Sequence, residues 1–117
     1  MMPLLCRYKV GFDGEGRILA LDVDLYNNGG QTADLSMAVM ERGVSHVDNA
    51  YRVPNVHVRG HVCKTNLPSN TAFRGFGAPQ AMFVAETIVD KVRGFLRARA
   101  HCTVSLLGPF LDRSPSR

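Results

Sequence analysis

The stretch "TNLPSNTAFRGFGAPQ", from Thr65 to Gln80, joins a segment that alternates like a strand to a segment that repeats like a helix. A loop in solvent has no need of two aromatic rings, and a core segment disfavours an arginine. Phe73 and Phe76 are three residues apart. In a tight turn, one ring can therefore anchor the loop in the core while the other offers its face to a flat ligand.

The glycines and the arginine of this stretch suit a ligand that is partly anionic. Gly75 and Gly77 permit backbone angles that are closed to other residues and let a ligand approach the main chain. Free N–H groups ahead of a helix favour an anion, and Arg74 adds a fixed cation with five donors. Two interpretations stay open from the residues alone. The stretch is either a pocket wall or a structural turn in which Arg74 pairs with an acid.

The N-terminal third of the chain predicts a β-hairpin. Residues 7–12 alternate between apolar and polar, "DGEG" at 13–16 is a turn signal, and residues 17–26 alternate again. Asp22 and Asp24 fall on the polar face of the second strand. Its apolar face carries Leu19, Leu21, Val23 and Leu25.

A helix is expected over about Ala33 to Asn49, and it places Arg42 on a flank of its own. Beside the main apolar stripe lies a further face on which Arg42 stands with aliphatic residues. An arginine there either extends to solvent or points into a site, and the spacing alone favours solvent. The apolar stripe consists of Met37, Met40, Val44 and Val47, and the further face of Leu35, Val39, Arg42 and His46.

A third strand and a second helix complete the predicted elements. The strand covers Val56 to Cys63, where His57 and His61 share a face but lie about 13 Å apart, too far for one metal ion. We interpret that face as the polar side of a sheet. Pro79 suits the first turn of the second helix. That helix is expected to bury Met82, Ala85, Val89 and Val92.

Composition limits the classes of function. The chain has 117 residues, enough for one small domain, and no window approaches the roughly 18 apolar residues of a membrane span. Three separated cysteines without a C-x-x-C pair predict reduced thiols. Much of the net charge of +4 sits in the C-terminal tail and gives little support to nucleic-acid binding. The arginines of that tail are Arg93, Arg97, Arg99, Arg113 and Arg117.

The motif "SNTAFRGFGAPQ", with "CKTNLP" before it, resembles the molybdenum hydroxylases, the family of xanthine dehydrogenase and aldehyde oxidase. The similarity continues upstream through "YKVGFDGEGRILALDVDLYNNGGQTADLS" and "HVDNAYRVPNVHVRGHVCKTN". It covers residues 4–92. The resemblance implies an α+β fold made of a hairpin, a helix, a strand, a glycine-rich loop and a helix. These elements would form an incomplete piece of a larger molybdopterin-binding domain.

The resemblance also assigns roles to individual residues. Arg74 fills the position of the family arginine that contacts the molybdenum–pterin cofactor, without being a side-chain ligand of the metal. Phe73 and Gly75, on either side of it, are expected to bind the cofactor as well. Phe76 fills the position of the ring that lies against a purine substrate. Arg42 fills the position of an arginine that approaches the substrate in xanthine dehydrogenases, and this replaces the expectation of a solvent-facing side chain.

The implied activity is the oxidative hydroxylation of purines at a molybdenum–molybdopterin centre. The substrates would be hypoxanthine and xanthine, and the product urate. The family also uses 2Fe-2S clusters, FAD and NAD, and their sites are absent from this sequence. A small-molecule purine partner, a homodimeric parent enzyme and a cytoplasmic location are expected, with no nucleic acid and no membrane partner. A guanidinium at Arg42 suits the chemistry, because attack on a purine carbon pushes negative charge onto the ring.

The sequence departs from the family after Val92. Residues 93–117 form a divergent arginine-rich tail that we expect to be disordered, and the chain as a whole is interpreted as incomplete. Neither the family loop G-G-F-G-G-K-E nor its catalytic glutamate has a match here, so the isolated chain is expected to be inactive. Two alternatives stay open: a piece of an aldehyde oxidase, and a non-catalytic short product that associates with the full-length enzyme.

Overall fold

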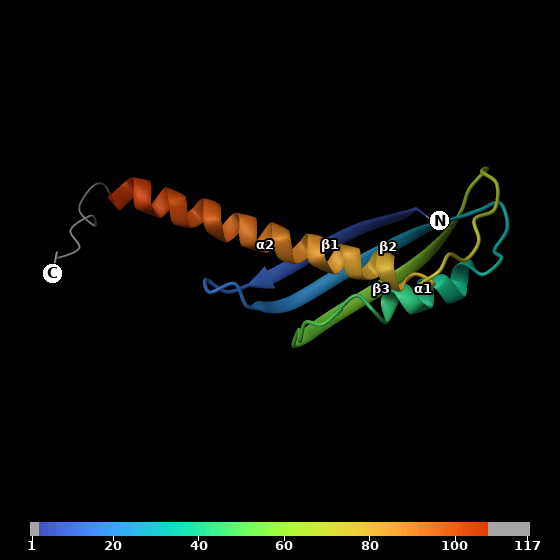
Figure 1. Ribbon diagram of the computed structural model, residues 1–117, viewed down its shortest axis with the longest axis horizontal. Helices are drawn as coiled ribbons and strands as arrows, with labels where there is room; N and C mark the ends of the chain where they lie inside the picture. The colour runs from blue at the N-terminus through green and yellow to red at the C-terminus, as the bar shows by residue number, and fades with distance from the viewer. Residues whose placement is uncertain (1–2, 108–117) are drawn as a thin grey trace.

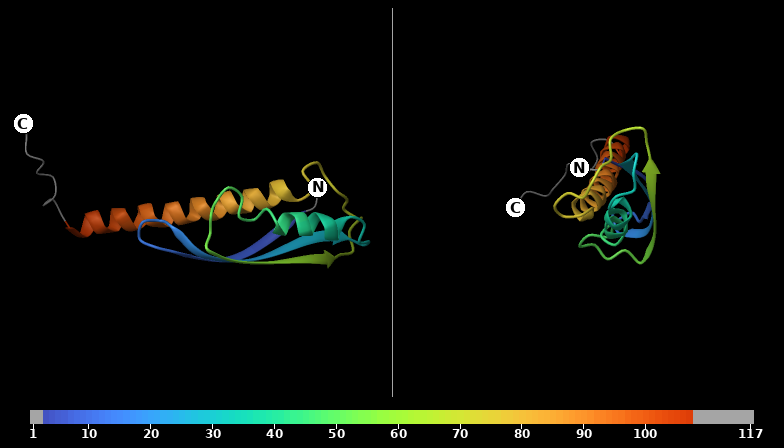
Figure 2. Two further views of the ribbon diagram at one scale, coloured as in Figure 1. Left: turned by 90° about the horizontal axis from the view of Figure 1, so that it is seen from below. Right: turned by 90° about the vertical axis from the view of Figure 1, so that its right-hand side faces the viewer.

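The computed structural model describes residues 3–107, and the side chains of residues 3–99. A three-stranded sheet carries both helices on one of its faces, as Figures 1 and 2 show. This arrangement confirms the predicted α+β class and the predicted order of elements. The elements are β1 (Leu4–Phe12), β2 (Ile18–Gly30), α1 (Ser36–Val44), β3 (Asn55–Lys64) and α2 (Ala78–Leu107).

The predicted hairpin is confirmed. Strands β1 and β2 pair antiparallel, with Tyr8 opposite Val23. Their turn is held by the carboxylate of Asp13, which accepts the backbone N–H groups of Glu15 at 3.0 Å and Arg17 at 2.8 Å. Strand β3 then pairs with β2 in parallel, so the chain must cross from one end of the sheet to the other. Helix α1 lies in that crossover.

The core lies between β2 and the helices. Leu21, Val23 and Leu25 alternate inward along β2, and the last two are fully buried. Leu19 was expected on the same face, but 48% of its surface is exposed. It borders an open hollow between the start of β2, residues 51–54 and Val89 of α2, so its side chain is only partly covered. The helices contribute Met40, Ala81 and Ile88 to the core, and Val47 joins it from the turns after α1.

Helix α1 is shorter than predicted and is rotated about its axis. It ends at Val44, and turns follow where the sequence predicted a helix to Asn49. Met37 was expected to be buried and is 61% exposed, whereas Val39 is 6% exposed. The rotation has a cause in packing, because the backbone of Val39 lies against Gly77 of the loop before α2.

Helix α2 buries a different stripe from the predicted one. Met82 was expected in the core and is 36% exposed, and Val89 is only partly buried. The predictions for Ala85 and Val92 are confirmed. Three of the buried positions are alanines, whose small side chains let α1 and β1 approach the helix closely. The buried stripe consists of Ala78, Ala81, Ala85, Ile88 and Val92.

Helix α2 also continues beyond the predicted end at Val92. It runs to Leu107, so residues 93–107 are helical where we expected disorder. Phe95 packs edge-on against Phe12 of β1, with ring centroids 5.7 Å apart. The helix therefore keeps contact with the sheet past the predicted boundary. Residues 108–117 of the predicted tail lie outside the described residues.

Candidate functional site

The glycine-rich loop forms a tight turn directly before α2. Gly75, Phe76 and Gly77 all have positive φ angles, of 93°, 54° and 92°. The N–H of Phe76 donates to the carbonyl of Phe73 at 2.8 Å, and the N–H of Ala78 donates to the carbonyl of Gly75 at 3.1 Å. Two glycines make this conformation accessible, but Phe76 adopts it as a bulky residue. Such a conformation persists only where the surrounding structure enforces it.

The loop is seated on α1 through a contact between backbones. A Cβ atom at Gly77 would collide with the carbonyl oxygen of Val39, and a Cβ at Gly43 would lie 3.7 Å from the carbonyl oxygen of Gly77. Both glycines are buried. The absence of side chains thus lets the loop and the last turn of α1 touch. Arg42 and Phe76, which each precede one of these glycines, become neighbours.

Arg42 and Phe76 form the centre of the candidate site. The guanidinium carbon of Arg42 lies 5.7 Å from the centroid of the Phe76 ring, within the range of a cation–π interaction. Arg42 is exposed and Phe76 is half-buried. None of the ion pairs among the described residues involves Arg42. The site therefore presents a cation beside an aromatic ring at the surface.

The main chain of Arg42 is held by the residues that end α1. The hydroxyl of Ser45 donates to the Arg42 carbonyl at 3.1 Å, and Nδ1 of His46 lies 2.8 Å from the same oxygen. This carbonyl belongs to the last turn of the helix, where carbonyl groups lack the usual hydrogen bond from the backbone N–H four residues later. Side chains replace the missing helical partners. The backbone from which Arg42 extends is fixed in this way.

The remaining predicted site residues face outward from the loop. Arg74 is exposed, and Phe73 is 55% exposed. Gly75 packs its backbone against Pro79, because a Cβ there would collide with the proline ring. No ion pair of Arg74 is seen within the described part of the chain, so the interpretation of the loop as a turn closed by an acid gains no support. The loop offers its guanidinium and an aromatic ring to the outside.

Sequence reasoning missed the two residues that make this arrangement possible. Gly43 was passed over within a predicted helix, although a glycine inside a helical pattern is a known signal of close packing. Val39 was placed on a secondary face. The signal for both was present only in part, because which residue faces Gly43 depends on the tertiary structure.

The opposite face of the sheet is polar, and Asp22 and Asp24 on it are paired with basic side chains. Arg59 donates from Nε to Asp24 at 2.6 Å, and this hydrogen bond lowers the pKa of Asp24. His57 contacts Asp22 at 3.0 Å, and His61 stacks on Tyr26 with centroids 4.7 Å apart. The two histidines thus contact different residues, as expected for a polar sheet face. Among the described residues no cluster of three metal-ligating side chains is found.

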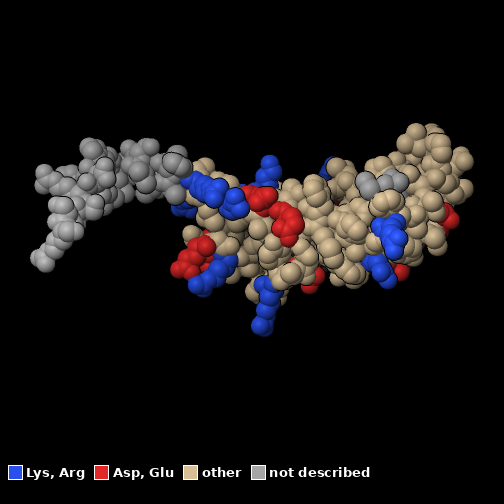
Figure 3. Space-filling view, in the orientation of Figure 1, with Lys and Arg blue, Asp and Glu red and all other residues tan. Residues whose placement is uncertain are grey.

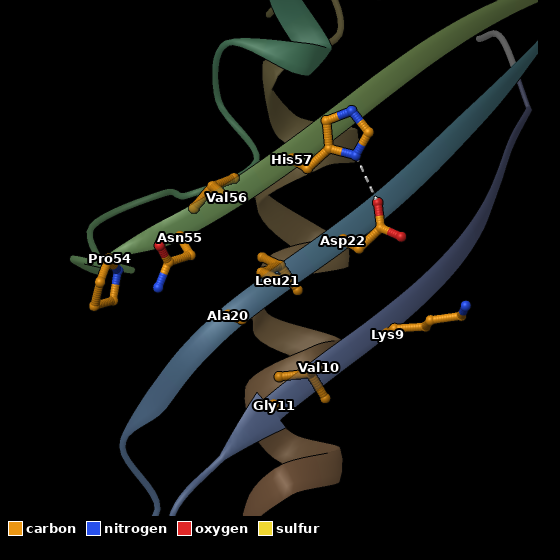
Figure 4. A pocket seen from close by; sticks show the side chains of 10 residues that line it. All are labelled: Lys9, Val10, Gly11, Ala20, Leu21, Asp22, Pro54, Asn55, Val56 and His57. Atoms are coloured by element: carbon orange, nitrogen blue, oxygen red, sulfur yellow. Dashed lines mark hydrogen bonds and ion pairs between the residues drawn. The ribbon is translucent and has the colours of Figure 1, made fainter.

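A shallow hollow on this polar face lies away from the candidate site. Figure 4 shows it over all three strands, with the helix behind the sheet. Gly11 and Ala20 pair with each other beside the row formed by Lys9, Asp22 and His57, and their small size leaves space there. Arg42 and Phe76, by contrast, belong to α1 and to the loop before α2, which is on the helix side. The hollow therefore takes no part in the site.

Positive and negative side chains are interspersed on the molecular surface. Over the described residues on the face drawn in Figure 3, lysines and arginines lie among aspartates and glutamates. No helix within the described range is long and apolar enough to cross a membrane. Cys6 and Cys63 are free thiols, and Cys102 lies outside the residues whose side chains are described.

Comparison with protein families identifies the domain type. Residues 2–96 match the sequence model of the molybdopterin cofactor-binding domain. The chain belongs to this family. The matched range includes Arg42, the whole glycine-rich loop and the beginning of α2 past Val92.

Individual relatives of this molybdopterin cofactor-binding chain are large redox enzymes. It is 60% identical over 94 residues to a xanthine dehydrogenase of Emericella nidulans, covering 80% of this chain and 7% of the relative. It is 59% identical over 90 residues to a nicotinate hydroxylase of the same fungus, covering 77% and 7%. A xanthine dehydrogenase of Oryza sativa subsp. japonica is 65% identical over 86 residues, covering 74% and 6%. The chain therefore spans about 7% of the length of these relatives.

Solved structures place the same fold within larger enzymes. An aldehyde oxidoreductase from Desulfovibrio gigas matches with a TM-score of 0.68 and 27% identity, over 78% of this chain and 10% of that one. An aldehyde oxidoreductase from Desulfovibrio desulfuricans matches with a TM-score of 0.74 and 27% identity, over 81% and 10%. The three strands and two helices are thus part of a molybdenum hydroxylase domain.

The residues present fit the anionic cofactor that binds to this family. Arg74 stands exposed at the turn that opens α2, where the positive end of the helix macrodipole also lies. Gly75 is exposed beside it, with a positive φ angle that other residues rarely adopt. A phosphate or a pterin of partial negative charge suits this combination of donors.

Proposed function

We propose that this chain forms one wall of the cofactor and substrate site of a xanthine dehydrogenase-like oxidoreductase that hydroxylates purines such as hypoxanthine and xanthine. One observation carries the proposal. The guanidinium of Arg42 lies 5.7 Å from the ring of Phe76, although the two residues are 34 positions apart in the chain. The family membership of the chain and the 60% identity with a xanthine dehydrogenase support the reaction class.

Phe76 and Arg42 have complementary roles in this proposal. A planar heterocycle packs against the ring of Phe76, which is held half-buried by its turn. Arg42 then lies at the edge of the heterocycle and stabilises the negative charge that develops on it during attack at a ring carbon. Gly43 and Gly77 keep the two side chains together. The chain thus binds, orients and electrostatically stabilises the substrate.

Arg74, Phe73 and Gly75 would hold the molybdenum–molybdopterin cofactor on the outer side of the loop. When bound, the cofactor supplies the redox chemistry of the hydroxylation. Arg74 contributes a guanidinium that donates to oxygens of the cofactor, and it is not a ligand of the metal. The parent enzyme would also use 2Fe-2S clusters, FAD and NAD, which bind elsewhere. A homodimeric parent and a cytoplasmic location complete the proposal.

The purine substrate has a competitor within the same reaction class. A relative that is 59% identical is named as a nicotinate hydroxylase, and nicotinate is also an electron-poor nitrogen heterocycle. The similar solved structures are aldehyde oxidoreductases. We favour a purine over an aldehyde, because a cation beside a ring is suited to charge that spreads over a heterocycle.

A chimeric enzyme tests the substrate class. The Emericella nidulans xanthine dehydrogenase would carry residues 2–96 of this chain in place of its own matching segment. We expect the chimera to oxidise hypoxanthine with a higher kcat/KM than nicotinate or benzaldehyde. Preferred turnover of nicotinate or of the aldehyde, with full molybdenum content, would overturn the purine assignment.

A second candidate function is association without catalysis. Strands β1 and β3 are the two edges of the sheet and leave unpaired backbone groups along their outer sides. These edges favour pairing with a full-length enzyme. Co-expression with the tagged Emericella nidulans enzyme tests this candidate. Co-purification in a fixed ratio would support it, and recovery of the chain only as free monomer would contradict it.

A further inference from the structure

Arg42 and Phe76 depend on the relative position of two helices. Arg42 extends from the last turn of α1, and Phe76 precedes the first turn of α2. The backbones of the two regions touch at Gly77, and Met40 of α1 packs in the core with Ala81 and Ile88 of α2. These contacts are apolar and have little directional preference. A second attachment, made by hydrogen bonds, adds a constraint on the direction of α1.

The second attachment is a carboxylate on α2. Glu86 accepts a hydrogen bond from Nδ2 of Asn49 at 2.7 Å. The hydroxyl of Tyr51 lies 2.9 Å from each of its two oxygens. Both donors belong to the segment between α1 and β3, which Figure 2 shows rising from the end of α1 beside α2. Hydrogen bonds to a charged acceptor are stronger than those between neutral groups.

The donor segment has no regular structure to hold it otherwise. Residues 45–50 form turns, and Asn49 adopts a positive φ of 50°. Val47 is buried between the helices, so the segment is in contact with the core while its side toward solvent carries Asn49 and Tyr51. Glu86 therefore closes the outer side of a packed connection.

The attachment at Glu86 lies well away from the contact at Gly77. Glu86 lies eight residues after Ala78, where α2 begins, which corresponds to about 12 Å along a helix. A hydrogen-bonded attachment at that distance restrains the orientation of α1 on α2 in addition to the apolar packing near the site. Among the described residues, Glu86 makes its hydrogen bonds to Asn49 and Tyr51, and the ring contact of Arg42 is with Phe76.

We propose that Glu86, with Tyr51 and Asn49, positions Arg42 over Phe76 from outside the site. This inference rests on the proposed function, because it concerns the geometry of the same pair. It makes Glu86 a positioning residue rather than a catalytic one. Loss of the carboxylate or of the tyrosine hydroxyl loosens the segment that follows α1, and Arg42 then shifts away from the ring.

Nuclear magnetic resonance on the full 117-residue chain tests the inference. Protons above an aromatic ring are displaced upfield, so the side-chain resonances of Arg42 report its position over Phe76. A Phe76→Leu variant gives the reference value without the ring. We expect Glu86→Gln and Tyr51→Phe to move the Arg42 resonances toward that value. The control Asp90→Asn removes a nearby acid with no hydrogen bond to the segment and is expected to leave them unchanged.

The methyl resonances of Val23 and Val47, both fully buried, show whether each variant keeps its core. Tyr51→Phe removes only a hydroxyl, so it decides the question if Glu86→Gln unfolds. Arg42 resonances equal to the wild type in both variants, with the core intact, would overturn the inference. A Phe76→Leu variant that leaves Arg42 unchanged has a different meaning. The pair itself would then be absent, and the proposed function would fail together with the inference.

Discussion

Individual glycines decide where the site forms. Gly77 brings the loop onto α1, and its φ of 92° belongs to the left-handed region that side chains rarely adopt. Arg42 and Phe76 meet because the residues after them are small. The two glycines that follow them therefore bring the pair together, more than Arg42 and Phe76 themselves do.

The substitution Gly77→Ala is expected to lower the free energy of unfolding by at least about 2 kcal/mol, since the new methyl group meets the carbonyl of Val39 in a strained conformation. Urea denaturation measures the loss. Gly94→Ala is the matched control, because a Cβ there meets nothing within 4 Å and alanine favours the helix. Equal stability of the Gly77→Ala variant and the wild type would contradict the packing described for the loop.

Tyr51 gives the fold a sensitivity to alkaline pH. The hydrogen bond to Glu86 is the main cause that raises the pKa of the Tyr51 hydroxyl above its ordinary value. The folded state therefore favours the protonated phenol. Its contribution is complete below the unfolded pKa of about 10 and is lost as the pH rises through the folded pKa.

The wild type should accordingly lose stability above about pH 10 more steeply than Tyr51→Phe, which has no hydroxyl to ionise. Thermal unfolding midpoints of both proteins between about pH 8 and 12 measure the difference. Parallel curves for the two proteins would show that Glu86 does not hold the phenol as described.

The sequence alone left open whether the Arg42 side chain faces solvent or a site, and the reason is physical. Spacing along a helix places a residue on a face but does not say what covers that face. Arg42 was assigned to solvent on spacing and to a site on resemblance, and the structure brings it to Phe76. The roles of Arg42, Arg74, Phe73, Gly75 and Phe76 toward substrate and cofactor stay predictions.

At the scale of elements, local signals predicted the sheet better than the helices. The hairpin follows from alternation and from the turn at Asp13, both of which are encoded within a few residues. Which face of α1 and of α2 is buried depended on where the facing element had small residues that allow close packing. Alanines at positions 81 and 85 and the glycine at 77 provided it, so the expected burial of Met37 and Met82 was wrong. Periodicity alone could not find these faces.

The extension of α2 belongs to the fold, and Phe95 tests this. Phe95→Ala removes the edge-on contact with Phe12 and is expected to lower the free energy of unfolding by about 0.5–1.5 kcal/mol. Phe83→Ala is the matched control, because Phe83 is 74% exposed and the change there should be within about 0.5 kcal/mol. If the two variants unfold alike, the end of α2 is not packed on β1.

At the scale of the whole molecule, we propose that the chain supplies one wall of a larger site. It spans about 7% of the length of its curated relatives. The pair of Arg42 and Phe76 and the glycine-rich loop are both present at its surface, whereas the family glutamate loop and catalytic glutamate have no match in the sequence. The sequence revealed the family through one long motif, but composition and periodicity contained no sign of a molybdenum enzyme.

The isolated 117-residue chain is expected to show no oxidation of hypoxanthine when it is supplied with molybdenum cofactor and a dye that accepts electrons. The physical reason is that one wall neither encloses the cofactor nor supplies a general base. The Emericella nidulans enzyme under the same conditions serves as the positive control. Turnover by the chain alone, above that of cofactor in buffer, would contradict this expectation.

The central claim is that Arg42 stabilises charge on a heterocyclic substrate beside Phe76. The most direct measurement is kcat/KM for hypoxanthine in the chimera that carries residues 2–96, with and without Arg42→Met. Arg52→Met, at an exposed arginine outside the site, is the control. We predict a loss of about 10²–10³-fold for Arg42→Met at unchanged molybdenum content, and no comparable loss for Arg52→Met. An unchanged kcat/KM in the Arg42→Met enzyme would contradict the account.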